Sequence, residues 1–303
     1  MATADQTALA GAWESKVDPA LLQEMNLRGD AAEVEFIIEL TAQAEIGDTS
    51  HLGSKEAKGQ YVFEQLTAVA NASQGPLLAQ LQAQNLPHRA YWVTNAIWVR
   101  GQLALLPQLA QRDDVAYLHA NPIVRLPELP SVDEQMEQAL ELLAIEWGVQ
   151  KINAPSMWAE GFTGQGAVVG GQDTGYDWDH PALIGKYRGW NGSTADHNYN
   201  WHDAIHSGNG GVCGLNSTVP CDDNGHGTHT MGTMVGDDGG ANQIGVAPGA
   251  KWVGCRNMDV GNGTPTTYIE CFQWFLAPTD LADSNPMPSD GPARHQQFVG
   301  LPS

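Results

Sequence analysis

Two residues of this sequence, an aspartate and a histidine, have neighbours that would support acid–base chemistry. Asp173 follows the apolar residues 167–169, and Gly175 behind it lets the chain turn sharply. His226 stands between two glycines, which permit close approach of the backbone to a bound molecule. A buried carboxylate can hold a histidine in one tautomer and stabilise the imidazolium that forms during proton transfer. The pair therefore predicts the orienting acid and the general base of a Ser-His-Asp triad.

The same residues also allow a metal site. His226 and His229 have the spacing of two ligands on one face of a helix. With Asp173 they could form a two-histidine, one-carboxylate centre, and the protein would then be a metal-dependent hydrolase. The small and apolar residues around His229 favour a packed interior over an open, hydrated metal. We therefore prefer the triad interpretation.

The elements that must position the pair alternate between strand and helix patterns. Strands are predicted at residues 165–174 and 251–258. Helices are predicted to begin at His226 and to cover residues 266–276. Such alternation predicts a parallel sheet with helices on both faces. Working residues collect at the carboxyl ends of the strands in such sheets. We expect residues 147–303 to form this α/β unit.

A smaller α+β unit is predicted to precede it, at residues 31–127. The expected elements are strands at 33–41, 88–99 and 115–124, and helices at 54–84 and 103–111. The second strand could be two strands joined near Asn95, and Gly75-Pro76 marks a break in the first helix. Residues 1–30 are polar and aperiodic and predict a loose leader. Residues 128–146 are acidic and predict a linker with a short exposed helix at 136–145.

The composition excludes some partners. The net charge of −21 argues against nucleic acid and anionic membrane surfaces. No apolar run approaches the roughly 18 residues that a membrane helix needs. No basic segment followed by an apolar one stands at the start, so no signal peptide is visible.

Four cysteines stand in the second half of the sequence, at 213, 221, 255 and 271. Cys213 and Cys221 bracket a loop whose Gly, Asn and Pro content suits closure by a disulfide in an oxidising compartment. Four free buried thiols are an equally good interpretation. A zinc site is less favoured because no Cys-x-x-Cys pair is present.

Several ordered motifs resemble the subtilisin-like serine proteases, or subtilases. They are the Asp motif at residues 172–175 with 179–183, the His motif at 224–233, the following segment at 244–250, and the start of the mature domain at 147–155. Residues 33–124 are similar in pattern to the family's propeptide, an inhibitor and folding chaperone with a ferredoxin-like fold. The resemblance covers about residues 33–277 and implies a zymogen, an intramolecular propeptide partner, and a processing site near Glu146.

By this resemblance Asp173 orients, His226 is the general base, and His229 is structural. Residues 255–263 would border a groove for peptide or protein substrates. No organic cofactor is implied, and the protein would be secreted or periplasmic. The stretch at 187–221 is longer than in compact family members and suggests a disulfide-pinned surface loop. The family often binds structural calcium, for which the candidate ligands here are Asp222, Asp223, Asp237 and Asp238.

The family's nucleophilic serine has no match in this sequence. Ser284, Ser289 and Ser303 lack the small-residue context of a nucleophile at a helix start. The chain as written is therefore predicted to be inactive, and the alternative is that it acts as a propeptide-type protease inhibitor or chaperone fragment. A shifted reading of the codons from about residue 290 can spell a segment resembling the family's substrate-binding strand. This predicts a reading-frame slip near Gly291.

Overall fold

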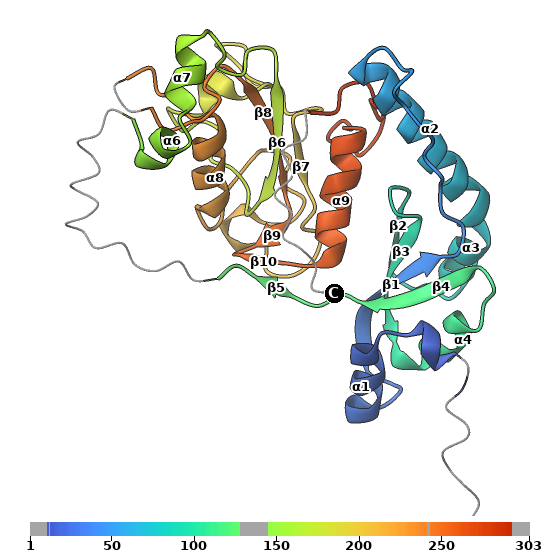
Figure 1. Ribbon diagram of the computed structural model, residues 1–303. Coiled ribbons are helices and arrows are strands. Elements are labelled where there is room, and N and C mark those ends of the chain that lie inside the picture. The colour runs from blue at the N-terminus through green and yellow to red at the C-terminus, as the bar shows by residue number, and fades with distance from the viewer. Residues whose placement is uncertain (1–10, 12, 128–144, 241–242, 293–303) are drawn as a thin grey trace, which may run out of the picture. The chain divides into compact units, whose positions relative to one another are not determined.

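The computed structural model describes residues 11, 13–127, 145–240 and 243–292 (Figure 1). The chain divides into two compact units, Met1–Pro122 (unit 1) and Ile123–Ser303 (unit 2). Each is described by itself. Residues 136–144 of the predicted linker helix and most of the segment with the predicted frame slip lie outside the described residues. Ile145, the last residue of that predicted helix, forms a β-bridge with Gln243 instead.

Unit 1 is built on a four-stranded antiparallel sheet of order β2-β3-β1-β4. Its elements are α1 (Pro19–Arg28), β1 (Glu33–Leu40), α2 (Lys55–Ser73), α3 (Gly75–Ala83), β2 (His88–Tyr91), β3 (Ala96–Gln102), α4 (Leu106–Ala110) and β4 (Val115–Ala120), with 3₁₀ turns at Glu14–Lys16 and Leu103–Leu105. From β1 onward this order is the β-α-β-β-α-β pattern of ferredoxin-like folds. Phe36, Ile38 and Leu40 alternate along β1 into the core, as its period of two predicts.

The leader predicted for residues 1–30 is wrong in its second half. Residues 19–28 form α1, which Asp18 caps by accepting a hydrogen bond from the Ala20 amide, 2.8 Å away. Val17 and Leu21 are buried in the core of unit 1. The cap followed by a proline at the first helical position is a helix-start signal. That signal outweighs the weak apolar periodicity of this short segment.

Unit 2 contains a parallel sheet of order β6-β8-β7 and a small antiparallel sheet of order β5-β10-β9. Its elements are β5 (Val124–Arg125), α6 (Trp147–Lys151), α7 (Ala154–Ala159), β6 (Val168–Asp173), β7 (Trp201–Asp203), α8 (His226–Val235), β8 (Lys251–Arg256), β9 (Met258–Asp259), β10 (Asn262–Gly263) and α9 (Pro265–Leu276), with 3₁₀ turns at Ile184–Lys186 and Gly211–Cys213. In Figure 1, α8 and α9 lie on opposite faces of the parallel sheet. The α/β architecture predicted from the alternation of strands and helices is confirmed.

The central strand β8 sends its side chains alternately to these two faces. Trp252 is fully buried in a cluster with Met231 of α8. Val253 is fully buried on the other face, in a cluster with Trp274 of α9. Parallel sheets are covered on both faces, and the residues of β8 between Lys251 and Arg256 carry no polar side chain.

Two disulfides lie within unit 2. One joins Cys213 to Cys221, as the loop composition suggested, and the other joins Cys255 of β8 to Cys271 of α9. In both, the Cα atoms are 5.7 Å apart. The interpretation as four free thiols is therefore wrong. Among the helices that the structure describes, none is both long and apolar enough to cross a membrane.

Candidate active site

Asp173 and His226 meet at the carboxyl end of the parallel sheet. Asp173 is the last residue of β6, and His226 is the first residue of α8. The Nδ1 atom of His226 lies 2.7 Å from Oδ1 and 2.9 Å from Oδ2 of Asp173. The aspartate is buried, whereas about a quarter of the histidine side chain is exposed. Nδ1 is thereby fixed by the carboxylate, and Nε2 is the ring nitrogen left for proton transfer.

Other groups hold the Asp173 carboxylate in place. Its Oδ1 accepts a hydrogen bond from the Thr174 amide at 2.8 Å, and its Oδ2 accepts one from the Thr230 hydroxyl at 3.1 Å. A buried carboxylate that accepts several hydrogen bonds keeps one orientation. The carboxylate therefore presents a fixed acceptor to the His226 ring.

Glycines bring α8 close enough to β6 for this contact. Gly225, which precedes the helix, has a φ of +91°, a conformation that side chains disfavour. A Cβ atom on Gly227 would lie 2.0 Å from the carbonyl oxygen of Gly175. Only glycine fits there, so the glycines on both sides of His226 have a structural reason.

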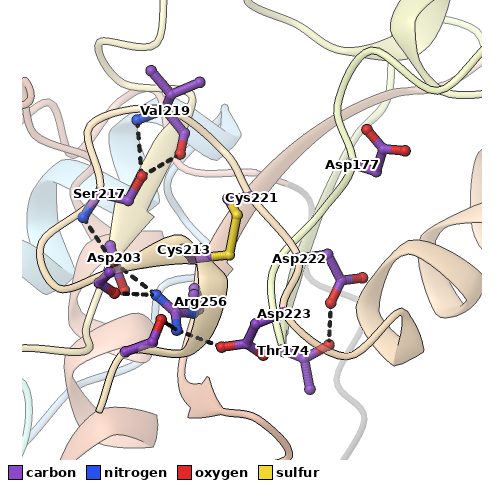
Figure 2. Close-up of a disulfide and its surroundings, with 12 residues drawn as sticks. Thr174, Asp177, Asp203, Cys213, Ser217, Val219, Cys221, Asp222, Asp223 and Arg256 are labelled. Carbon is purple, nitrogen blue, oxygen red and sulfur yellow. Dashed lines mark hydrogen bonds and ion pairs between the residues drawn. A yellow bond between two sulfur atoms is a disulfide. The ribbon is translucent and has the colours of Figure 1, made fainter. Parts of the chain in front are cut away.

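Asp222 organises the turn that leads into α8. Its Oδ1 accepts a hydrogen bond from the Thr174 hydroxyl at 2.8 Å (Figure 2). Oδ1 also accepts from the Gly225 amide at 2.8 Å, and Oδ2 accepts from the Thr228 amide at 2.9 Å. Burial raises the pKa of Asp222, but the hydrogen bonds from Thr228 and Gly225 outweigh it and hold the pKa below its usual value. A charged carboxylate at the start of α8 also suits the positive end of the helix dipole.

His226 opens onto a cavity of about 620 Å³, which is the candidate site. It is lined by residues 125–127, 224–226, 229 and 260–262. A larger cavity of about 970 Å³ lies on another side of α8, against His180 and Ile244. Neither Asp173 nor His226 lines that larger space, so we assign the chemistry to the smaller one.

The segment after unit 1 forms one wall of the smaller cavity. The predicted strand at 115–124 divides, and its last residue belongs instead to β5, which pairs antiparallel with β10. The Leu126 amide donates to the Gly261 carbonyl at 2.9 Å and extends this pairing. Of residues 255–263, which were predicted to border a substrate groove, Val260, Gly261 and Asn262 line this cavity. The contribution of Arg125, Leu126 and Pro127 was missed, because pairing between segments so far apart leaves no local signal.

The rival metal centre is not formed by the described residues. They contain no group of three or more His, Cys, Asp or Glu side chains that could hold a metal ion. The Nδ1 atom of His226 is hydrogen-bonded to Asp173 and is not free to bind a metal. His229 was predicted to lie in a packed interior, but its side chain is exposed on α8.

The four candidate calcium ligands each have other partners. Asp222 accepts from Gly225 and Thr228, Asp223 pairs with the buried Arg256, Asp237 pairs with Lys186 at 2.9 Å, and Asp238 accepts from the Gly240 amide. Their oxygens face separate groups, so this set does not fit one calcium ion.

None of the described serines belongs to the site. Ser284 and Ser289 do not line the cavity beside His226, and Ser303 lies outside the described residues. The Ser284 hydroxyl donates to the Ala282 carbonyl in an exposed turn.

Fold and site together define a class: an α/β protein with a carboxylate–imidazole pair at the carboxyl end of a parallel sheet, as in serine hydrolases. Residues 164–285 match the family model described as the subtilase family, Peptidase S8. The chain therefore contains a subtilase (Peptidase S8) domain.

Curated relatives agree with this assignment. The chain is 34% identical to Bacillopeptidase F of Bacillus subtilis over 84% of its own length, which is 18% of that protein. It is 33% identical to the Major intracellular serine protease of Bacillus subtilis over 46% of this chain and 37% of that one. The chain thus spans well under half the length of these relatives.

The fold also resembles a solved structure, that of the epidermin leader peptide processing serine protease of Staphylococcus aureus. The TM-score is 0.52, over 80% of this chain and 48% of that one. At 13% sequence identity this likeness supports the fold alone.

Proposed function

We propose that this chain is part of the precursor of a secreted serine endopeptidase in which His226 is the general base and Asp173 orients it. The contact of Nδ1 with both carboxylate oxygens, at 2.7 and 2.9 Å, carries the proposal. The two disulfides agree with an oxidising compartment.

The pair performs the acid–base part of peptide hydrolysis. The Asp173 carboxylate accepts a hydrogen bond from Nδ1–H, so the lone pair of the His226 ring is on Nε2. Nε2 takes the proton of a serine hydroxyl while the serine oxygen attacks the peptide carbonyl. Asp173 then stabilises the imidazolium, and Nε2 returns the proton to the leaving amine. The nucleophilic serine is not among the described residues, and we propose that the 303 residues supply the acid–base half of the triad.

The partner at the site is proposed to be an extended peptide. β10 already pairs with β5, and Leu126 continues that pairing along the cavity that His226 lines. Main-chain pairing with a strand edge accepts peptides of many sequences. Residues 31–127 are proposed as the propeptide, with self-removal near Glu146, which stands exposed immediately before α6.

The tautomer of His226 tests the acid–base role. With ¹⁵N-labelled histidine, NMR of the chain should show His226 with its proton on Nδ1, and Asp173→Asn should shift the proton toward Nε2. Asp238→Asn, at an exposed turn, is the control and should leave the His226 signals unchanged. An Nε2–H tautomer in the unmutated chain would refute the proposed role.

A second candidate function is inhibition of a related protease. The independent core of unit 1 and the strand β5 that follows it favour this alternative. The full chain, added to Bacillopeptidase F of Bacillus subtilis, should then slow hydrolysis of a peptide substrate in a saturable way. No slowing at micromolar chain would exclude this function.

A further inference from the structure

A buried arginine that the proposed mechanism does not use lies near the catalytic pair. Arg256 is the last residue of β8, and its side chain is fully buried. Its Nη1 donates to the Gly214 carbonyl at 2.9 Å and lies 3.4 Å from a carboxylate oxygen of Asp203. Its Nη2 donates to the Gly210 carbonyl at 2.9 Å and to the carboxylate of Asp223. Figure 2 shows the guanidinium between the two aspartates.

One side of this arrangement leads to the catalytic histidine. The Asp223 side chain is fully buried, and its second oxygen accepts from the Val260 amide at 3.0 Å. Asp223 is the direct neighbour of Asp222, whose carboxylate fixes the amides that lead into α8. His226 follows three residues after Asp223. The position of its ring therefore depends on where Asp223 is held.

The other side leads to the disulfide-closed loop. Gly210 and Gly214, whose carbonyls bind the guanidinium, have φ angles of +71° and +73°. The Cys213–Cys221 bond joins the loop to the same turn, and the Cys221 carbonyl accepts from the Tyr176 amide at 3.2 Å. Arg256 thus connects a pinned loop, the end of a central strand and the turn before His226.

The geometry of the guanidinium is required for these contacts. The two Nη atoms of Arg256 donate at the same time to two carbonyl oxygens and to two carboxylates. A lysine ammonium has a single nitrogen and cannot reach all four acceptors. Without the arginine, Asp223 would be a buried carboxylate that lacks its cation. The turn would then rearrange to expose or neutralise that carboxylate.

We infer that Arg256 is a positioning residue for His226: it fixes Asp223 against the disulfide-closed loop and so sets the turn from which the histidine projects toward Asp173. This inference rests on the proposed function of the pair. Arg256 acts through Asp223 and does not touch the reacting atoms.

The test uses the full chain and the His226 signals of ¹⁵N-histidine NMR. Arg256→Lys should broaden or split the Nδ1–H signal and lower the fraction of the Nδ1–H tautomer at least twofold, while Arg256→Met should abolish the signal. The matched control is Arg188→Lys, because Arg188 is also largely buried and binds a carbonyl and Asp290 elsewhere in unit 2. It should lower stability and leave the His226 signals unchanged.

A second variant covers the case in which Arg256 variants fail to fold. Asp223→Asn keeps the side-chain shape but removes the charge pair, and it should produce the same loss of the Nδ1–H signal. If folded Arg256→Lys or Asp223→Asn protein retains the signal of the unmutated chain, the inference is wrong. An equal loss in Arg188→Lys would also overturn it. If the unmutated chain lacks the signal, the proposed function fails instead.

Discussion

Replacing Glu270 with glutamine should reduce the pH dependence of the stability of unit 2. Glu270 lies on α9 and is buried, and its Oε1 accepts hydrogen bonds from Nε2 of His202 at 2.9 Å and from Nε2 of His206 at 2.6 Å. The Nδ1 atom of His202 lies 3.3 Å from Asp283. With a carboxylate at each ring nitrogen, His202 binds both protons, and the charged cluster joins β7 to α9.

The size of the effect follows from the pKa shifts. Burial alone lowers the pKa of His202, but the hydrogen bonds to Asp283 and Glu270 outweigh it and raise the pKa from 6.5 to about 9. Burial alone raises the pKa of Glu270, but the hydrogen bonds from His202 and His206 lower it from 4.5 to about 2. The two shifts describe the same interactions from each partner, so they are counted once. A shift of this size corresponds to about 3 kcal/mol.

The sign of each shift fixes the pH window. A raised histidine pKa stabilises the fold fully below pH 6.5, and this contribution is lost as the pH rises through about 9. The lowered glutamate pKa stabilises it above pH 4.5, and that contribution is lost as the pH falls through about 2. The cluster therefore contributes fully between pH 4.5 and 6.5 and weakens on either side.

Hydrogen exchange of the α9 amides measures this contribution, with rates corrected for the intrinsic effect of pH. Between about pH 6 and pH 10, the unmutated chain should lose more protection than Glu270→Gln, by at most about 3 kcal/mol, because Asp283 still raises the pKa of His202 in the variant. Glu160→Gln, at an exposed glutamate after α7, is the control and should follow the unmutated chain. If Glu270→Gln shows the same alkaline loss as the unmutated chain, the cluster is not its source.

Two further predictions concern stability. Gly227→Ala should lower the free energy of unfolding of unit 2 by about 3 kcal/mol, because its Cβ would lie 2.0 Å from the Gly175 carbonyl oxygen. Gly232→Ala in the same helix, with no atom within 3.4 Å of its Cβ, should be neutral or stabilise by about 0.5–1 kcal/mol. Equal urea midpoints for the two variants would contradict the close packing at the first. Replacing Cys255 and Cys271 by alanine should cost about 3 kcal/mol, since the bond closes a loop of 16 residues. A urea midpoint that responds to neither this change nor a reductant would argue against that bond.

The sequence predicts the acid–base pair well because its determinants are local. Asp173 ends an apolar strand, and His226 begins a helix between glycines, so each motif carries its own structural context. The parallel sheet brings the two together without further information. The division of the predicted strand at 88–99 into β2 and β3 could also be predicted, because asparagine tolerates the φ of +45° found at Asn95.

Other features depend on contacts that no local pattern encodes. The pairing of β5 with β10 joins segments that are far apart in the sequence. From the sequence alone, Arg256 would be assigned to the surface. It is buried because β8 is the central strand and because the loop at residues 210–214 covers its guanidinium group. The loop composition suggests the Cys213–Cys221 bond, but the bond between Cys255 and Cys271 depends on the packing of α9 against β8. In each case tertiary packing decides the outcome.

The pairing of β5 with β10 has a consequence for binding measurements. Val124 and Arg125 belong to the same chain as β10, so they meet it at an effective concentration on the order of millimolar, whatever the protein concentration. A free peptide that binds the same edge of β10 must compete with the tethered strand β5, whose effective concentration does not change. Dilution weakens the binding of the free peptide and leaves the tethered strand unaffected. Apparent affinities for added peptides should therefore rise once the chain is cut after Pro127, although no contact at the edge has changed.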